Sequence, residues 1–210
     1  SGEILLDSMC NSIAKSGISV TNIGLVTSPI LYYAAKKSVS KSGIMITGSH
    51  NPKDDNGIKM VINDKPVSGT EILSLTKCVP EFDKTKKEII KINIIEDYIN
   101  DVLHKITLNQ PEKVKVVVDC GNGAAGCVAP ELFKRLGCNV INLFSEIDGN
   151  FPNHHPDPGK LANLQDLIKA VKDEKADLGL AFDGDGDRVG VITGKGNVVF
   201  PDKIMMLFAE

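Results

Sequence analysis

The chain has 210 residues, of which 42% are hydrophobic and 24% charged, the balance of a globular protein with one large or two modest domains. Its net charge of −3 excludes the strongly basic surface of a nucleic-acid-binding protein. The apolar runs are too short to cross a bilayer and no signal peptide opens the chain, so we expect a cytoplasmic protein without a membrane partner.

The first half of the chain alternates helical and extended patterns. Apolar residues at Ile4, Leu5, Met9 and Ile13 predict a helical face that Gly17 ends. The pattern then predicts, in order, a strand at 20–26, a helix at 29–39, strands at 43–47 and 57–62, a helix at 69–79 and a charged surface connection at 81–91.

The second half continues the alternation, which predicts the α/β class: two three-layer units with mixed, largely parallel sheets, joined near residue 95. Its expected elements are a helix at 96–106, a strand at 113–119, a helix at 124–136, a strand at 139–143, a structured loop at 148–159, an amphipathic helix at 160–175, and strands at 178–182 and 189–193.

The two ends indicate a piece of a longer protein. Ser1 replaces an initiating Met and is a plausible helix N-cap, and a helix that starts at Pro201 is interrupted at Glu210. We therefore expect a first unit that is incomplete at its N-terminus and a third unit that has only begun.

The five cysteines and two arginines limit the chemistry. The cysteines are odd in number and form no C-x-x-C pair, so we expect reduced, buried thiols. Arginine is the natural bidentate clamp for phosphate, and a chain with only Arg135 and Arg188 is poorly equipped to hold a phosphorylated substrate in this way.

Two loops that follow predicted strands carry candidate chemistry, because ligands of such sheets bind beyond the carboxyl ends of strands. In Thr47-Gly-Ser-His-Asn-Pro52, small residues around Ser49 let its hydroxyl face a ligand, with His50 adjacent and Lys59 on the next strand. Taken alone, this loop is better explained as an ordinary polar turn.

The second loop, Asp183-Gly-Asp-Gly-Asp-Arg188, holds three carboxylates at alternate positions that can surround one hard cation. An EF-hand fits poorly, because Arg188 stands at the place of the invariant glycine and Gly194 at that of the bidentate glutamate. Mg²⁺ held by a few carboxylates leaves room for a phosphoryl oxygen.

A third loop, Gly121-Asn-Gly-Ala-Ala-Gly126, matches the dinucleotide fingerprint between a strand and a helix, with Glu146 at a suitable distance. A tight strand-to-helix turn explains the glycines better, because no partner motif for hydride chemistry appears and the other two loops indicate phosphoryl transfer. The neighbouring His154 and His155 have no third metal ligand at a diagnostic spacing, which favours a structural role.

Together these motifs resemble the α-D-phosphohexomutases, and most closely their bacterial phosphomannomutase/phosphoglucomutase branch. The resemblance rests on 47–52 with Asn56-Gly-Ile-Lys59, on 183–188, and on Gly121-Asn-Gly123 and Asn150-Phe-Pro-Asn-His-His-Pro-Asp-Pro158. It implies that phosphate moves between O1 and O6 of glucose or mannose through a phosphoserine and a hexose 1,6-bisphosphate.

Carried over residue by residue, the resemblance makes Ser49 the phosphoserine, and Asp183, Asp185 and Asp187 the ligands of one Mg²⁺ that also contacts the serine phosphate. His50 and Lys59 match positions of proton transfer and phosphate positioning, and Arg188 matches the arginine that closes the metal loop. No cofactor beyond Mg²⁺ and the bisphosphate is implied, and the glycine fingerprint becomes a structural turn.

The resemblance also implies boundaries: residues 1–95 as the later part of domain 1, 96–197 as domain 2 and 198–210 as the start of domain 3. Because the other substrate-binding segments of the family are absent, we expect slow turnover by this chain alone, and self-association through the incomplete first domain. The alternatives are a phosphoglucosamine mutase, a non-catalytic Mg²⁺ and phosphosugar binder, and a dinucleotide-dependent oxidoreductase.

Overall fold

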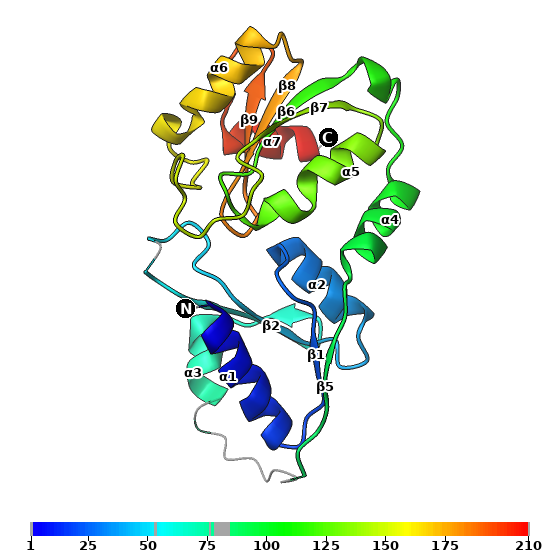
Figure 1. Ribbon diagram of the computed structural model, residues 1–210, viewed down its shortest axis with the longest axis vertical. Coiled ribbons are helices and arrows are strands. Elements are labelled where there is room, and N and C mark those ends of the chain that lie inside the picture. The colour runs from blue at the N-terminus through cyan, green and yellow to red at the C-terminus, as the bar shows by residue number, and fades with distance from the viewer. Residues whose placement is uncertain (1, 53, 76, 78–84, 210) are drawn as a thin grey trace. The chain divides into compact units, whose positions relative to one another are not determined.

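The computed structural model describes residues 2–52, 54–75, 77 and 85–209 (Figure 1). The chain divides into two compact units, which we call unit 1 (Ser1–Gly48 and Asp54–Ile94) and unit 2 (Ser49–Lys53 and Ile95–Glu210). The five residues from Ser49 to Lys53 therefore belong to unit 2, although unit 1 flanks them on both sides in the sequence.

Unit 1 contains a parallel pair of strands, β1 and β5, and a separate antiparallel sheet in the order β2-β3-β4. Helix α2 packs against β2 at Gly43, where a Cβ would lie 3.0 Å from Leu31 Cδ1. The described elements are α1 (Gly2–Lys15), β1 (Val20–Asn22), α2 (Ser28–Lys37), β2 (Gly43–Ile46), β3 (Ile58–Ile62), β4 (Lys65–Pro66), α3 (Gly69–Leu75) and β5 (Ile89–Lys91).

Unit 2 is built on a five-stranded sheet in the order β10-β9-β8-β6-β7, with β6 parallel to both β7 and β8. Its described elements are α4 (Ile95–Lys105), η1 (Pro111–Lys113), β6 (Lys115–Asp119), η2 (Ala124–Cys127), α5 (Ala129–Arg135), β7 (Asn139–Leu143), η3 (Leu161–Leu164), α6 (Gln165–Asp173), β8 (Leu178–Phe182), β9 (Val189–Thr193), β10 (Val198–Val199) and α7 (Pro201–Phe208).

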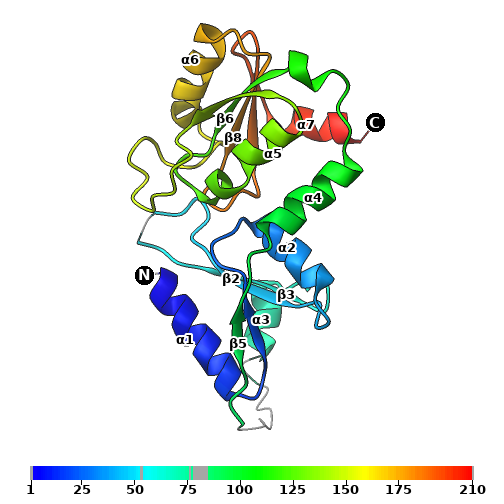
Figure 2. The ribbon, with the colours of Figure 1, turned by 45° about the vertical axis from the view of Figure 1, so that its right-hand side comes forward.

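Helices cover both faces of this sheet, as Figures 1 and 2 show for α5 and α6. Strand β6 supplies both halves of the core, because successive side chains of a strand point to opposite faces. Val116 and Val118 pack with Ala129 of α5, whereas Val117 packs with Leu167 of α6. Unit 2 is therefore the predicted three-layer α/β unit.

The α/β class and the mixed sheets are confirmed, with a larger antiparallel share than expected. The reason is the length of the connections. A parallel neighbour needs a crossover of about a dozen residues, whereas only six residues, 183–188, join β8 to β9. That short connection is the predicted metal loop.

The predicted helix at 124–136 is wrong, because the chain forms the short 3-10 helix η2 and then α5, with Val128 between them at φ −139° and ψ −43°. Pro130 explains the break, since proline has no N–H to donate to the carbonyl four residues earlier and its ring clashes with that carbonyl, whereas it is tolerated in the first turn of α5. The helix predicted at 160–175 is also shorter than expected: this segment begins with the 3-10 helix η3 and is α-helical only from Gln165 to Asp173.

Three further predictions fail in part. The predicted strand at 20–26 stops at Asn22, whose Oδ1 accepts a hydrogen bond from the N–H of Gly24, a residue with φ 75°. The expected connection at 81–91 contains β5, and its residues 81–84 lie outside the described part of the chain, as do residues 76, 78 and 79 of the predicted helix at 69–79. The expected buried face of α1 is centred on Cys10 and Ala14, while Ile4 is 76% exposed.

The thiols agree with the expected reduced state wherever the structure describes them. Cys10, Cys120, Cys127 and Cys138 are free, and burial raises the pKa of Cys120 to about 12, which keeps its thiol unreactive. Cys78, Ser1 and Glu210 lie outside the described residues.

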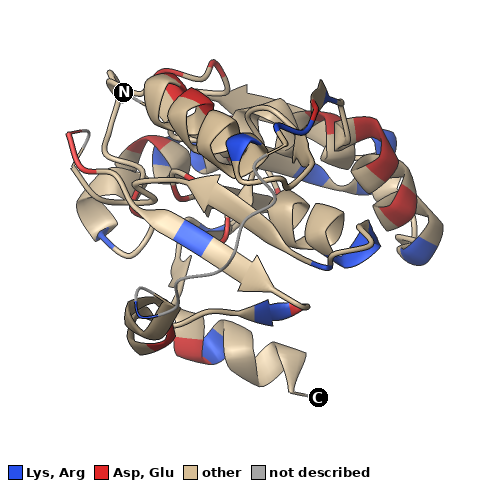
Figure 3. Ribbon diagram, turned by 90° about the horizontal axis from the view of Figure 1, so that it is seen from below, with Lys and Arg blue, Asp and Glu red and all other residues tan. Residues whose placement is uncertain are grey.

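Among the described helices, none combines the length and the apolar composition needed to cross a bilayer. Acidic and basic residues are interspersed along the ribbon (Figure 3).

Candidate active site

The loop between β8 and β9 gathers three carboxylates at one point of unit 2. Asp183, Asp185 and Asp187 each offer a ligand atom, and these atoms lie within 4.8 Å of one another. Gly186, at φ 70°, allows the chain to turn so tightly, and its N–H donates to the Asp183 carbonyl at 3.1 Å. A cluster of hard carboxylate oxygens with this spacing can hold a metal ion, and Mg²⁺ and Ca²⁺ prefer such ligands.

Asp183 is the buried centre of this loop, with 0% exposure. Its Oδ1 accepts the backbone N–H groups of Asp187 and Arg188, both at 3.0 Å. Burial raises the pKa of Asp183, as do the charges of Asp185 and Asp187, whereas the hydrogen bonds from Arg188 and Ser49 lower it, with an overall increase. The three charges thus destabilise one another, and a bound cation would offset this repulsion.

Ser49 contacts the centre of the metal loop directly. Its hydroxyl donates to Asp183 Oδ2 at 2.9 Å. A Cβ built on Gly184 would lie 2.1 Å from the carbonyl oxygen of Ser49, so only glycine permits this approach of the two loops. Ser49 itself has φ 51°, a left-handed conformation that is unfavourable for a residue with a side chain.

His50 and Arg188 flank the serine hydroxyl. His50 Nδ1 lies 3.3 Å from Ser49 Oγ, and a guanidinium nitrogen of Arg188 lies 3.3 Å from His50 Nε2. Because arginine can only donate, Nε2 is the acceptor, and the proton of the neutral ring is then on Nδ1 and points to Ser49. In this arrangement His50 donates to the serine oxygen, which suits phosphate positioning better than removal of the serine proton.

Lys59 lies in unit 1, on β3, and is partly buried. Its ammonium group donates to Oγ of Ser28 at 3.1 Å, and Ser28 is fully buried at the start of α2. A catalytic role for Lys59 therefore stays a prediction from the sequence.

The loop from Asn150 to Pro158 is anchored on the sheet through a buried ion pair. His154 Nε2 lies 3.0 Å from Asp119 Oδ2, at the end of β6, and its Nδ1 lies 3.0 Å from the carbonyl of His155. The hydrogen bond with Asp119 is the largest of the causes that raise the pKa of His154, and burial opposes it. With an acceptor at each ring nitrogen, the imidazolium form is favoured, and the expected structural role is consistent with this pair.

This pair predicts a pH-dependent stability. The folded-state pKa of His154 lies above the ordinary value of 6.5, so its contribution is complete below about pH 6.5 and is lost as the pH rises through the folded-state pKa. Hydrogen bonds to charged groups contribute about 1.5–3 kcal/mol, and we expect a loss of this order in urea unfolding between about pH 6 and pH 9. His154→Gln, which can donate to Asp119 without titrating, should lack this decline; equal pH profiles of the two proteins would contradict the assignment.

His155 makes a contact that the sequence did not reveal. Its Nε2 lies 2.6 Å from the backbone carbonyl of His50, the residue after Ser49. The two histidines are 105 positions apart in the sequence. The paired histidines in a loop rich in Pro, Asn and Asp were the only available signal, and they do not indicate a partner.

The glycine fingerprint is a structural turn. Its amides are used within the protein: Gly121 donates to Asp119 Oδ1, Asn122 to the Phe144 carbonyl and Ala124 to the Gly184 carbonyl. A Cβ on Gly126 would lie 2.1 Å from the carbonyl oxygen of Ser145. The glycines thus allow close packing of backbones, and these amides are not available for a pyrophosphate.

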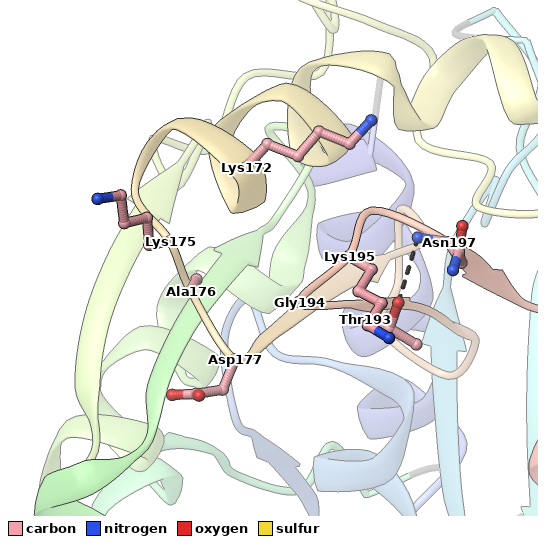
Figure 4. Close-up of a pocket in the computed structure, with 8 residues that line it drawn as sticks. All are labelled: Lys172, Lys175, Ala176, Asp177, Thr193, Gly194, Lys195 and Asn197. Atoms are coloured by element: carbon pink, nitrogen blue, oxygen red, sulfur yellow. Dashed lines mark hydrogen bonds between the residues drawn. The ribbon is translucent and has the colours of Figure 1, made fainter.

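A surface hollow lies at the opposite end of β8 from the metal loop (Figure 4). It is lined by Lys172, Lys175 and Lys195, among others, and by none of the predicted site residues. Figure 4 shows the charged end of Lys172 pointing away from those of Lys175 and Asp177, so the three do not converge on one ligand.

Comparison with known proteins gives two family matches that together cover most of the chain. Residues 1–85 match the family described as phosphoglucomutase/phosphomannomutase, alpha/beta/alpha domain I, and residues 96–196 match its domain II. Both the loop at 47–52, which we call the serine loop, and the loop at 183–188, which we call the metal loop, lie within these matches. The matches thus define the class of these two regions, the phosphoglucomutase/phosphomannomutase domains. The chain belongs to the α-D-phosphohexomutase family.

Individual relatives agree with this class. A phosphomannomutase/phosphoglucomutase of Pseudomonas syringae pv. tomato is 54% identical over all of this chain and 45% of its own length. A probable phosphoglucosamine mutase of Methanosphaera stadtmanae is 38% identical over all of this chain and 48% of its own. The crystal structure of a phosphoglucomutase/phosphomannomutase family protein from Burkholderia thailandensis superimposes with a TM-score of 0.91 at 41% identity, covering 98% of this chain and 46% of that one. The chain spans about half the length of the relatives it matches.

Proposed function

We propose that this chain supplies the phosphoserine and the Mg²⁺ loop of a mutase that interconverts the 1-phosphates and 6-phosphates of glucose and mannose. The observation that supports the proposal is the hydrogen bond between Ser49 Oγ and Asp183 Oδ2, because it brings the hydroxyl that we propose as the nucleophile against the three-aspartate cluster. The similarity to phosphomannomutase/phosphoglucomutase relatives supports the same reaction.

The proposed reaction has two phosphoryl transfers. In the first, O6 of a hexose 1-phosphate attacks the phosphorus on Ser49, the bond from phosphorus to Oγ breaks, and hexose 1,6-bisphosphate forms. After the sugar reorients, Oγ attacks the other phosphorus, the bond to O1 breaks, and hexose 6-phosphate leaves. Each transfer moves one proton from the attacking hydroxyl to the departing oxygen, a task that we assign to Lys59. Phosphoryl transfer depends mainly on such positioning and on neutralised charge.

Mg²⁺ is the metal that we propose for the aspartate cluster. Replacing the serine proton by a phosphoryl group turns the contact between Ser49 and Asp183 into one between like charges, whose repulsion a divalent cation held by the aspartates would offset. Ser49, through its phosphate, and Asp183, Asp185 and Asp187 would be the ligands, and Mg²⁺ would supply charge neutralisation. His50 and Arg188, which contact each other beside Ser49, are proposed to hold phosphate oxygens.

The wider predictions fit this proposal and are part of it. We assign residues 1–95 and 96–197 to the first and second domains of the mutase and 198–210 to the start of the third. Hexose 1,6-bisphosphate would act as the phosphate donor to Ser49, and a phosphohexose is the proposed substrate. Self-association through unit 1, slow turnover by this chain alone and a cytoplasmic location also remain proposals.

Phosphate uptake tests the proposed function. The purified chain is incubated with Mg²⁺ and glucose 1,6-bisphosphate, and added phosphate is mapped by mass spectrometry. We expect one phosphate on Ser49, none after chelation of Mg²⁺ and none in Ser49→Ala, while Ser12→Ala, a serine on the exposed side of α1, takes up phosphate normally. Absence of uptake by a folded chain, or uptake at other residues, would overturn the proposal.

The same assay separates the alternatives. A faster reaction with glucosamine 1,6-bisphosphate than with the glucose and mannose compounds would favour a phosphoglucosamine mutase. Calorimetric binding of the bisphosphate without uptake would indicate a non-catalytic binder. A fluorescence titration with NADH tests the oxidoreductase, for which the internally bonded amides of the glycine turn leave no pyrophosphate site.

A further inference from the structure

We propose that His155 is a positioning residue that holds the backbone of the serine loop, so that the Ser49 hydroxyl faces the metal loop. This inference rests on the proposed function of Ser49 and extends it to a residue in a different loop. The contact that carries it is the 2.6 Å hydrogen bond in which Nε2–H of His155 donates to the His50 carbonyl.

The serine loop needs such support, because Ser49 has an unfavourable backbone conformation. A residue with a side chain at φ 51° is disfavoured by roughly 1–2 kcal/mol, and such conformations persist where surrounding contacts determine them. The carbonyl that His155 holds belongs to His50, so the hydrogen bond constrains the His50–Asn51 peptide unit, the second peptide unit after the strained residue.

Other contacts fix the position of His155, so that it can restrain the backbone of the serine loop. Its ring packs edge-on against Phe151, with centroids 6.4 Å apart and planes at 84°. Its carbonyl accepts the N–H of Asp157 at 2.8 Å and lies 3.0 Å from Nδ1 of His154. His154 is anchored to the buried Asp119 at the end of β6. A continuous set of contacts thus runs from the sheet to the serine loop.

A second support lies on the neighbouring peptide. The carbonyl of Ser49 packs against Gly184, where a Cβ would lie 2.1 Å away, while the carbonyl of His50 is held by His155. Two successive carbonyls are therefore fixed by two different loops. Loss of the His155 bond should leave the aspartate cluster intact and let Ser49 leave its position beside Asp183.

Two substitutions separate the donor from the packing of the ring. His155→Phe keeps an aromatic ring against Phe151 and removes the donor. His155→Gln places an amide N–H near the position of Nε2 and restores the donor. His104→Phe is the matched control, because His104 is exposed on α4 and its Nδ1 contacts only the Asn100 carbonyl of the same helix among the hydrogen bonds described.

The first measurement is the rate of Ser49 phosphorylation at increasing glucose 1,6-bisphosphate. We expect His155→Phe to lower the limiting rate at least about tenfold, as befits a lost hydrogen bond to a partly buried carbonyl, with the half-saturating concentration changed less than about threefold. His155→Gln should stay within about threefold of the unsubstituted chain, and His104→Phe should match it. Equal rates for His155→Phe and the unsubstituted chain would overturn the inference, as would an equal defect in His155→Gln.

The second measurement does not depend on catalysis. Hydrogen exchange at the amides of Ser49, His50 and Asn51, followed by mass spectrometry of the peptide that contains them, should be faster in His155→Phe than in the unsubstituted chain, His155→Gln or His104→Phe. If Ser49 takes up no phosphate in any protein, the proposed function fails and the exchange data still decide the role of His155. Unchanged exchange in His155→Phe would exclude the positioning role even if Ser49 is phosphorylated.

Discussion

Replacing Asp185 with asparagine is expected to raise the stability of the metal-free chain and to remove most of its response to Mg²⁺. Asp185 is 3% exposed and adds to the repulsion around Asp183, so loss of one charge relieves the cluster when no cation is bound. With a cation present the same charge is an attractive ligand. A ligand at 100 times its Kd stabilises the folded state by about 2.7 kcal/mol, and this gain should nearly vanish if the substitution raises the Kd about 100-fold.

Thermal unfolding with and without Mg²⁺ provides the measurement. For a chain of this size, about 2.7 kcal/mol corresponds to a shift of the unfolding midpoint by roughly 5–10 °C. Asp173→Asn is the matched control: it makes the same change on the surface of α6, where Asp173 pairs with Lys169, and should leave the Mg²⁺ response intact. A full Mg²⁺ response in Asp185→Asn would show that the cation binds elsewhere.

Replacing Gly184 with alanine should separate the two loops and abolish most phosphate uptake. The added methyl group would lie 2.1 Å from the Ser49 carbonyl oxygen, so the serine loop must move by more than 1 Å to restore an ordinary contact distance. A displacement of about 1 Å at a reacting group can lower a rate about 100-fold, and overpacking of this kind costs about 1–3 kcal/mol of stability.

The control is Gly149→Ala, because a Cβ on Gly149 has no atom within 4 Å. Phosphate uptake at Ser49 and urea unfolding are measured on both variants. Uptake in Gly184→Ala within about threefold of Gly149→Ala would contradict the close approach of the serine and metal loops, since so severe a clash cannot be absorbed without moving the nucleophile.

The sequence predicts four of the five described strands of unit 2, misses the two-residue strand β10, and predicts the helix that follows β6 poorly. The predicted bounds of β7, β8 and β9 agree with the structure residue for residue, because short, largely apolar runs bounded by turn residues favour a strand. The helix predicted at 124–136 fails at Pro130, where a local break overrides an apparently continuous apolar pattern. Strand β5, three residues long, forms only because β1 pairs with it, and no local pattern marks such a partner.

The candidate site is likewise predicted only in part from the sequence. Two motifs separated by 134 positions suggested a shared centre, and the structure brings Ser49 to Asp183 within hydrogen-bonding distance. The tautomer of His50 depends on the donor-only guanidinium of Arg188, and the role of His155 on a contact with a backbone carbonyl. Every residue has a backbone carbonyl, so a contact with one does not require a particular residue type, and sequence patterns alone do not reveal it.

The course of the chain through the two units bears on how the site is assembled. The five residues that carry Ser49 are synthesised early, yet they belong to the unit whose sheet is completed only when β8, β9 and β10 have formed. Bringing Ser49 and Asp183 together closes a long loop of the chain, which costs conformational entropy. We therefore expect this contact to form late in folding, after the local helices and hairpins. During synthesis and refolding, Ser49 therefore lies on a tethered segment until the loop at 183–188 has formed. The same topology makes the serine loop an early segment to detach when the protein opens locally, so loss of reactivity should precede loss of the β6–β8 core.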